Sequence, residues 1–221
     1  MLYSSLVVLA LLGVAHAIYP ENHWQHSTKL TVDNFDDEIK NAVDSGKTMM
    51  VRWIASEGWG WWRKQAPAWN TISERYASHP DIVFGDVNLS EEQVRGNHNP
   101  GAGGWPTIKY FNKETGYEGA PYDKKTTKSM CDELGDNSYM EDYVVEAAGL
   151  TLCDVVTGEG CSDKEKTFAE KYSSKSSVDV KAQLDRLNGM NAKKMTPELA
   201  AWMKQRKAIL KSLLKNAGQE L

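Results

Sequence analysis

The chain has 221 residues, enough for one medium-sized domain and a smaller second one. Its hydrophobic share of 41% and charged share of 25% are those of an ordinary soluble globular protein. The net charge of -4 gives no electrostatic reason to expect nucleic acid as a partner, because phosphate binding requires clustered lysine and arginine.

Residues 1–17 have the pattern of a secretory signal peptide. A short apolar run from Leu6 to Val14 precedes Ala15-His16-Ala17, which has the small-x-small spacing of a cleavage site. The run is shorter than the roughly 20 residues that span a bilayer, and no later segment is apolar enough to cross one. We therefore expect the rest of the chain to enter the secretory lumen without a membrane span.

Alternating helix and strand patterns follow. Residues 33–45 predict a helix, because apolar side chains recur at every fourth position and acidic residues fill the first turn. The largely apolar residues 48–56 and 81–89 predict strands that are covered on both faces. Between them, the segment SEGWGWWRKQAPAW opens a second helix that runs to about Ser78. Residues 90–94 predict a short third helix with a serine as N-cap.

The next stretch predicts the rest of a sheet. Residues 96–106 are rich in glycine and lack apolar periodicity, which indicates a loop. Residues 107–112 predict a strand, residues 117–122 an antiparallel edge strand, and residues 126–134 a closing helix. This order of elements predicts an α/β fold with a mixed central sheet and helices on both faces.

From Ser162 onward the strand pattern ends, and Lys, Glu, Leu and Met recur at helical spacing to Asn216. We expect three helices there, the last with Thr196 as N-cap and Pro197 at its first position. No heptad pattern lasts long enough for a coiled coil, so the sequence predicts a small all-α C-terminal module.

The chain contains three cysteines and no Cys-x-x-Cys motif. Cys153 and Cys161 enclose a short loop, so we expect a local structural disulfide at the boundary between the two modules. Cys131 lies in the predicted closing helix, either as a packed thiol or as the partner in a mixed disulfide. His23 and His26 have no second pair at a ligand spacing, so we expect no metal site.

Three motifs give the first module a resemblance to the thioredoxin fold and, more narrowly, to the protein disulfide isomerase family. The run MMVRWIASEGWGWWRKQAPAW is similar to that family's strand, active-site turn and helix. GGWPTIKYFN is similar to its cis-proline loop, with Pro106 in the proline position, and Tyr117–Gly119 to a motif on its last strand. The resemblance implies a thioredoxin-like domain over residues 28–135.

The C-terminal module resembles the D-domain that follows thioredoxin domains in some endoplasmic reticulum relatives. The segments QLDRLNGM, KKMTPEL and RKAIL carry this resemblance. It implies a connector over residues 136–161, a helical module over residues 162–216, and a location in the endoplasmic reticulum lumen or outside the cell.

The active-site turn of the family reads Trp-Cys-Gly-His-Cys. Alignment on Arg63-Lys64 and Pro67 places Trp59 and Trp62 at the positions of its two cysteines. Redox catalysis requires a thiolate at the helix N-terminus and a second thiol, and an indole provides neither. The sequence as written therefore has no catalytic residues, unless Trp59 or Trp62 is a misread cysteine or selenocysteine.

The family also places a buried Glu in the strand before the turn and a Lys that pairs with it. An alignment without a gap puts Trp53 at the position of the Glu, and one inserted residue puts Arg52 there, with Asp86 near the position of the Lys. The gapped alignment gives the hypothesis of a buried Arg52–Asp86 ion pair with its charges swapped. The alternative is two independent solvated charges.

The turn and the cis-proline loop lie side by side in this fold, which would gather Trp59, Trp61 and Trp105 around Pro106. We expect Trp62 to pack into the core and the other three indoles to form an apolar patch for client polypeptide. The predicted function is a redox-inactive folding helper whose partners are unfolded or nascent secretory polypeptides, without a cofactor. The alternatives are an active thiol or selenol oxidoreductase, and a structural adaptor without a client groove.

Overall fold

The computed structural model describes residues 19–55, 61–102, 104–190 and 195–219, and leaves out the side chains of residues 61–63, 197–198 and 219. The expected signal peptide lies outside these residues and stays a prediction. Within them, no helix has the length and apolarity that crossing a bilayer requires.

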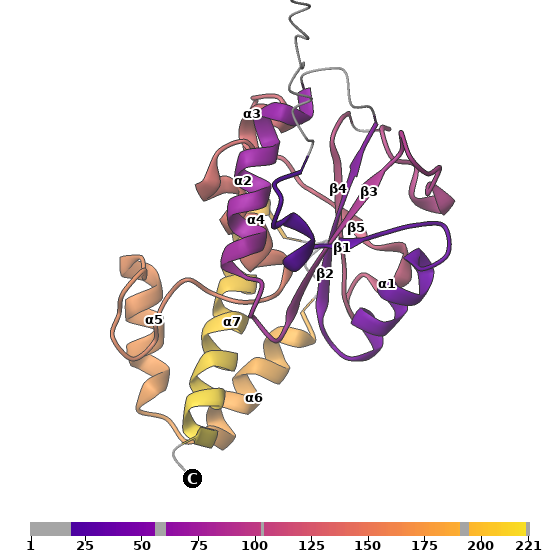
Figure 1. Cartoon of the computed structure of the whole chain (residues 1–221). Helices are drawn as coiled ribbons and strands as arrows, with labels where there is room; N and C mark the ends of the chain where they lie inside the picture. The colour runs from indigo at the N-terminus through magenta and orange to yellow at the C-terminus, as the bar shows by residue number, and fades with distance from the viewer. Residues whose placement is uncertain (1–18, 56–60, 103, 191–194, 220–221) are drawn as a thin grey trace, which may run out of the picture.

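A mixed five-stranded sheet forms the centre of the first module, in the order β1-β3-β2-β4-β5 (Figure 1). The strands are β1 (Thr28–Lys29), β2 (Thr48–Ile54), β3 (Ile82–Asn88), β4 (Thr107–Phe111) and β5 (Ala120–Pro121). β3 runs parallel to β1 and β2, whereas β4 is antiparallel to β2 and β5 is antiparallel to β4. This arrangement confirms the predicted α/β class.

Helices cover both faces of the sheet (Figure 1). α1 (Phe35–Asp44) packs on one face, while α2 (Trp61–Arg75) and α4 (Asn137–Ala147) pack on the other, with the short α3 (Met130–Glu133) beside α2. The described residues also include three short 3-10 helices: η1 (His23–Gln25) before β1, η2 (Gly96–His98) before β4 and η3 (Gly116–Glu118) before β5.

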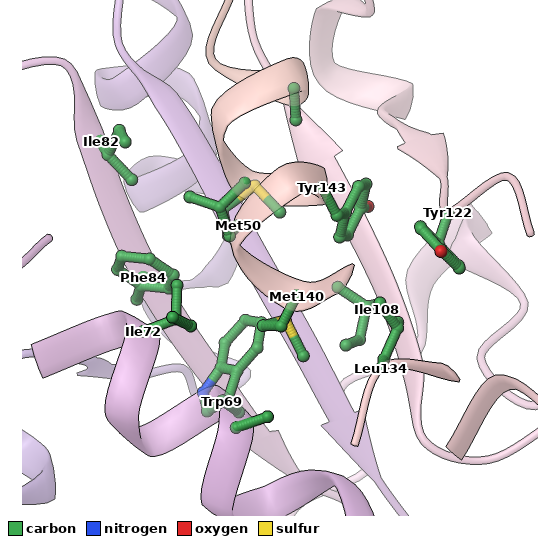
Figure 2. Packing of buried hydrophobic residues seen from close by; sticks show 13 residues of the cluster. Met50, Trp69, Ile72, Ile82, Phe84, Ile108, Tyr122, Leu134, Met140 and Tyr143 are labelled. Carbon is green, nitrogen blue, oxygen red and sulfur yellow. The ribbon is translucent and has the colours of Figure 1, made fainter. Parts of the chain in front are cut away.

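All seven residues of β2 are buried, and their side chains alternate between the two faces. Met49, Val51 and Trp53 pack in the cluster under α1, whereas Met50 packs in the cluster under α2 and α4. Figure 2 shows this second cluster, which includes Met50, Trp69, Ile72, Phe84, Ile108, Leu134, Met140 and Tyr143. Burial on both faces explains why the strand sequence is apolar throughout instead of alternating.

The C-terminal module consists of α5 (Asp163–Ser173), α6 (Ser177–Asn188) and α7 (Pro197–Gln219). These are the three helices that the sequence predicts. α7 packs against both others, and the small core contains Val180, Leu187, Met203 and Leu210. A capping box of Ser162 and Glu165 starts α5.

Two predicted helices differ from the structure. Residues 89–91 form a turn in place of the helix predicted over residues 90–94, because the Asn88 side chain accepts the Ser90 N–H at 3.0 Å. The helix predicted over residues 126–134 is shorter in the structure and is limited to α3. The Glu133 carboxylate accepts the backbone N–H groups of Lys125 and Thr126, which holds this part of the chain as a loop.

Candidate functional site

The loop before β4 contains a cis peptide bond between Trp105 and Pro106. Pro106 is buried, and Trp105 is half-buried with its ring against the loop. Gly101, at a φ of 95°, makes this possible, since a Cβ there would lie 2.6 Å from a ring carbon of Trp105. The Gly101 N–H also donates to Thr107 Oγ1 at 2.7 Å, which fixes the loop to the start of β4. The proline of this loop is therefore inside, whereas the Trp105 ring is partly exposed and packs against the cluster under α1.

Cys131 of α3 lies beneath this loop. Its thiol donates to the Trp105 carbonyl, with 2.7 Å between Sγ and O. Burial, together with the neighbouring Asp132 carboxylate, raises the pKa of the Cys131 thiol. The thiol therefore stays protonated at neutral pH and acts as a packed donor.

α3 also fixes this loop relative to α2, the helix that follows the tryptophan turn. Lys64 of α2 pairs with Asp132 at 2.9 Å. Gly135, just after α3, has no room for a Cβ, which would lie 2.8 Å from the Lys64 carbonyl oxygen. The cis-proline loop and the first turns of α2 thus lie against the same short helix.

Beneath α2, the structure brings Arg52 and Asp86 together as a fully buried pair. The two residues are partners in the parallel register of β2 and β3, and Arg52 Nε donates to Asp86 Oδ1 at 2.5 Å. Arg52 faces α2 and lies over the Trp69 ring, 5.0 Å from its centroid, whereas Trp53 faces α1. The structure thus contains the buried Arg52–Asp86 pair, whereas the alignment of Arg52 with the family's Glu stays a prediction.

Three further donors reach the second carboxylate oxygen of Asp86. They are the Ser27 hydroxyl at 2.6 Å, His23 Nε2 at 2.9 Å and the Trp69 indole N–H at 3.0 Å. Burial alone would raise the pKa of Asp86, but Arg52 and the bonds from His23 and Ser27 outweigh it and lower the pKa to about 2. Asp86 is therefore a fixed anion and a very weak proton acceptor.

The sequence reasoning missed His23, Ser27 and Trp69 as parts of this cluster. His23 and Ser27 belong to a polar N-terminal segment without periodicity, which folds over the edge of the sheet next to β1. The sequence signal for Trp69 is its helical spacing with Ile72 and Tyr76, which places the three on one apolar face of α2; in the structure Trp69 is fully buried.

The other predicted site residues are only partly described. Trp59 lies outside the described residues, and Trp61 and Trp62 begin α2 with side chains that are also outside them. The proposed gathering of indoles around the cis-proline loop thus stays a prediction, with Trp105 as its one described member. Cys153 and Cys161 are joined by a disulfide. Among the described residues, no group of three or more His, Cys, Asp or Glu side chains is placed to hold a metal.

The chain is similar in sequence to a disulfide-isomerase-like protein. No family model matches the chain. It is 28% identical over 145 residues to "Protein disulfide-isomerase-like protein EhSep2" of Emiliania huxleyi, a match that covers 65% of this chain and 58% of that protein. The chain thus matches a little over half the length of this relative.

A solved structure with partial likeness is the first thioredoxin domain of mouse protein disulfide-isomerase A4. It has a TM-score of 0.39 and 18% identity, and the match covers 56% of this chain and 76% of that domain. At this level the likeness adds no weight to the fold, which rests on the strand order and the cis-proline loop described above.

Proposed function

We propose that this chain is a thioredoxin-like protein of the protein disulfide isomerase family and that it acts as a redox-inactive folding helper of the endoplasmic reticulum lumen. In this role it binds unfolded or nascent secretory polypeptide through the apolar surface around Trp105. The expected signal peptide and the disulfide between Cys153 and Cys161 support a lumenal location.

The state of the cysteines is the observation that carries the proposal. The chain has three. Two of them form the disulfide of the connector, and the third, Cys131, is buried and donates to a backbone carbonyl. Thiol–disulfide exchange needs an accessible thiolate, and the raised pKa of Cys131 works against one.

The buried charges support the same conclusion. The family's Glu takes a proton from the second active-site thiol, but the gapped alignment puts Arg52 at that position, and a guanidinium cannot accept a proton. Asp86 accepts four hydrogen bonds and has a pKa of about 2, so it does not replace the missing acid. The pair keeps a structural role without a proton-transfer role.

Trp105 supplies the described part of the client surface. Its half-buried ring lies against Gly101, and its backbone carbonyl accepts a hydrogen bond from the Cys131 thiol. A rigid, amphipathic ring of this kind gives contact area at low conformational cost, which is why tryptophan is enriched at binding hot spots.

Two assays with the full chain test the proposal. We expect no acceleration of insulin reduction by dithiothreitol, and we expect binding of a fluorescein-labelled, carboxymethylated insulin B chain, measured by fluorescence anisotropy. Trp105→Ala should weaken this binding about tenfold, while Trp105→Phe, which keeps an aromatic ring, should retain most of it. Trp24→Ala is the matched control, because Trp24 is 42% exposed on the N-terminal segment. Accelerated insulin reduction, or equal losses for Trp105→Ala and Trp24→Ala, would contradict the proposal.

The second candidate is an oxidoreductase with cysteine or selenocysteine at position 59 or 62. The observation that favours it is the cis Trp105–Pro106 bond, because the loop that contains it and the first turns of α2 lie against the same short helix α3. Peptide mass spectrometry of residues 53–63 from the natural protein, after alkylation, decides between the two. Two indole masses support the redox-inactive helper, whereas an alkylated thiol or selenol supports the oxidoreductase.

A further inference from the structure

His98 is a buried histidine at the end of η2, where the loop that carries Trp105 begins. Only 9% of the residue is exposed. Its imidazole lies among three aromatic rings, with centroid distances of 5.2 Å to Phe35, 5.3 Å to Phe111 and 5.8 Å to Trp53. A neutral imidazole fits such an apolar place, whereas an imidazolium loses its hydration there.

The polar surroundings of His98 also favour the neutral ring. Its Nδ1 has no hydrogen-bond partner among the described residues, so a proton added there would be buried without an acceptor. The ring interacts with the backbone carbonyl of Glu118, and Lys109 Nζ donates to the same carbonyl at 3.5 Å. A protonated His98 would therefore lie beside an ammonium group that shares its acceptor.

The charged groups that face His98 come from β4, η3 and α1, while β2 faces the ring with the uncharged Trp53. Burial, the largest effect, and Lys109 of β4 lower the pKa of His98 from its ordinary value of 6.5, whereas Glu118 of η3 and Asp36 of α1 act to raise it. A lowered histidine pKa stabilises the folded arrangement above the ordinary value, and this contribution is lost as the pH falls below 6.5.

The aromatic rings around His98 also support the tryptophan surface. Phe35, Trp53 and Phe111 belong to the cluster under α1, and the partly exposed Trp105 ring packs against that same cluster. His98 and Trp105 thus lie near the two ends of one loop, and both rest on the same group of rings.

The backbone directly after His98 shows that this position is held by its contacts. Asn99 has a φ of 46°, in the left-handed region that a residue other than glycine keeps only where its surroundings fix it. The buried side chain of His98 is a contact of this kind. If the ring leaves the cluster, the chain at Asn99 can relax, and the start of the loop moves with it.

We propose that His98 is a proton switch for the loop between η2 and β4. With a neutral ring, His98 holds the start of this loop on the aromatic cluster. Uptake of one proton drives the charged ring into solvent and frees the loop that carries Trp105. Acid would then release client polypeptide from the tryptophan surface, a consequence that rests on the proposed function, whereas the loop opens with or without a client.

The amides of Gly101, Ala102 and Gly104 report on the loop, because each donates a hydrogen bond within it or to the start of β4. Hydrogen exchange of the full chain should show protection factors for these amides that are several times lower at about pH 5 than at about pH 7.5. Protection factors remove the intrinsic effect of pH on exchange, and the β2 amides serve as the internal reference. Unchanged protection of the loop amides, or an equal loss in β2, would overturn the proposal.

Two variants tie the pH dependence to His98. His98→Phe keeps an aromatic ring in the cluster and cannot take up a proton, so its loop should be equally protected at both pH values. His26→Phe, which removes a half-buried histidine from the N-terminal segment, is the matched control and should behave as the wild type. A pH dependence that persists in His98→Phe, or that disappears in His26→Phe, would contradict the switch.

Lys109→Gln gives a measurement that does not require a substitution in the aromatic cluster. Lys109 is partly exposed, and its removal takes away the cation that opposes protonation of His98. The NMR titration midpoint of the His98 ring should therefore move to higher pH in this variant. A midpoint that does not move, or that moves to lower pH, would show that His98 does not respond to the charges that face it.

Binding of the carboxymethylated insulin B chain separates the switch from the proposed function. From about pH 7.5 to about pH 5, wild-type binding should weaken several times more than binding by His98→Phe, a comparison that cancels titration of the peptide itself. An equal pH dependence in the two proteins would contradict control of the tryptophan surface by His98. If the wild type binds no peptide at either pH, the proposed function fails, and the protection factors of the loop amides still decide the switch.

Discussion

At the scale of single residues, Asp86 is a fully buried carboxylate of the first module that pairs with Arg52. Asp86→Asn would leave Arg52 buried without its counterion, so we expect a loss of about 3–5 kcal/mol in the free energy of unfolding at pH 7. Urea denaturation followed by tryptophan fluorescence measures this loss. Asp132→Asn, which breaks an exposed pair with Lys64, should cause little change.

The same carboxylate predicts a dependence of stability on pH. The pKa of Asp86 is about 2 in the folded chain and 3.8 as its ordinary value. A lowered pKa stabilises the folded state above the ordinary value, and this contribution is lost as the pH falls from about 4 to about 2. The difference between the wild type and Asp86→Asn should therefore shrink over that window, and a constant difference would show that Asp86 is not ionised in the folded chain.

Sequence reasoning could reach only half of this cluster. The Arg52–Asp86 pair follows from alignment with one inserted residue, because both residues lie in strands whose partners are fixed by the fold. The hydrogen bonds from His23 and Ser27 could not be predicted, since they come from a polar segment about 60 residues away with neither apolar periodicity nor a turn motif. Side-chain partners of this kind depend on tertiary packing alone.

At the scale of elements, Glu133 decides where the chain stops being a loop and becomes a helix. Its buried carboxylate accepts the backbone N–H groups of Lys125 and Thr126 at 2.7 Å and 2.8 Å, and also the Tyr122 and Thr126 hydroxyls. Burial opposes ionisation of Glu133, but these bonds prevail and lower its pKa to about 2. The helical pattern over residues 126–134 indicated a full helix, and local propensity could not reveal that one glutamate holds the first half of this segment as a loop.

Glu133→Gln tests this role. The amide keeps the shape of the side chain but loses its charge and can accept with only one oxygen, so we expect a loss of about 1–3 kcal/mol in the free energy of unfolding. Hydrogen exchange should show faster exchange of the Lys125 and Thr126 amides. The exchange rates of the β2 amides should change only as much as the overall loss of stability requires. Unchanged protection of both loop amides would mean that the loop is held by other contacts.

At the scale of the whole molecule, Glu146 of α4 joins the two modules. It binds Lys204 of α7 and Lys125 of the first module at the same time. Burial acts to raise the pKa of Glu146, but these two lysines outweigh it and the pKa is lowered. Both ion pairs of Glu146 are therefore formed at neutral pH and weaken in acid. The change in pattern after Ser162 predicts a separate helical module, and its boundary stays a prediction, since residues 137–147 of the expected connector form α4 and pack in the first module. The ion pairs of Glu146 could not be predicted, because helical spacing says nothing about partners in another module.

Glu146→Gln should loosen this junction with only a small effect on the stability of each module, since the pair is partly exposed. Limited proteolysis should then cut the connector between α4 and α5 several times faster, with fragments that correspond to the two modules. Glu141→Gln is the matched control, because Glu141 lies on the same helix but binds Arg75 and Tyr76 of α2, within the first module. Equal cleavage of the two variants would contradict this role of Glu146, because only Glu146→Gln breaks a contact between the modules. The modules would then be held together by the connector with its Cys153–Cys161 disulfide, which both variants keep.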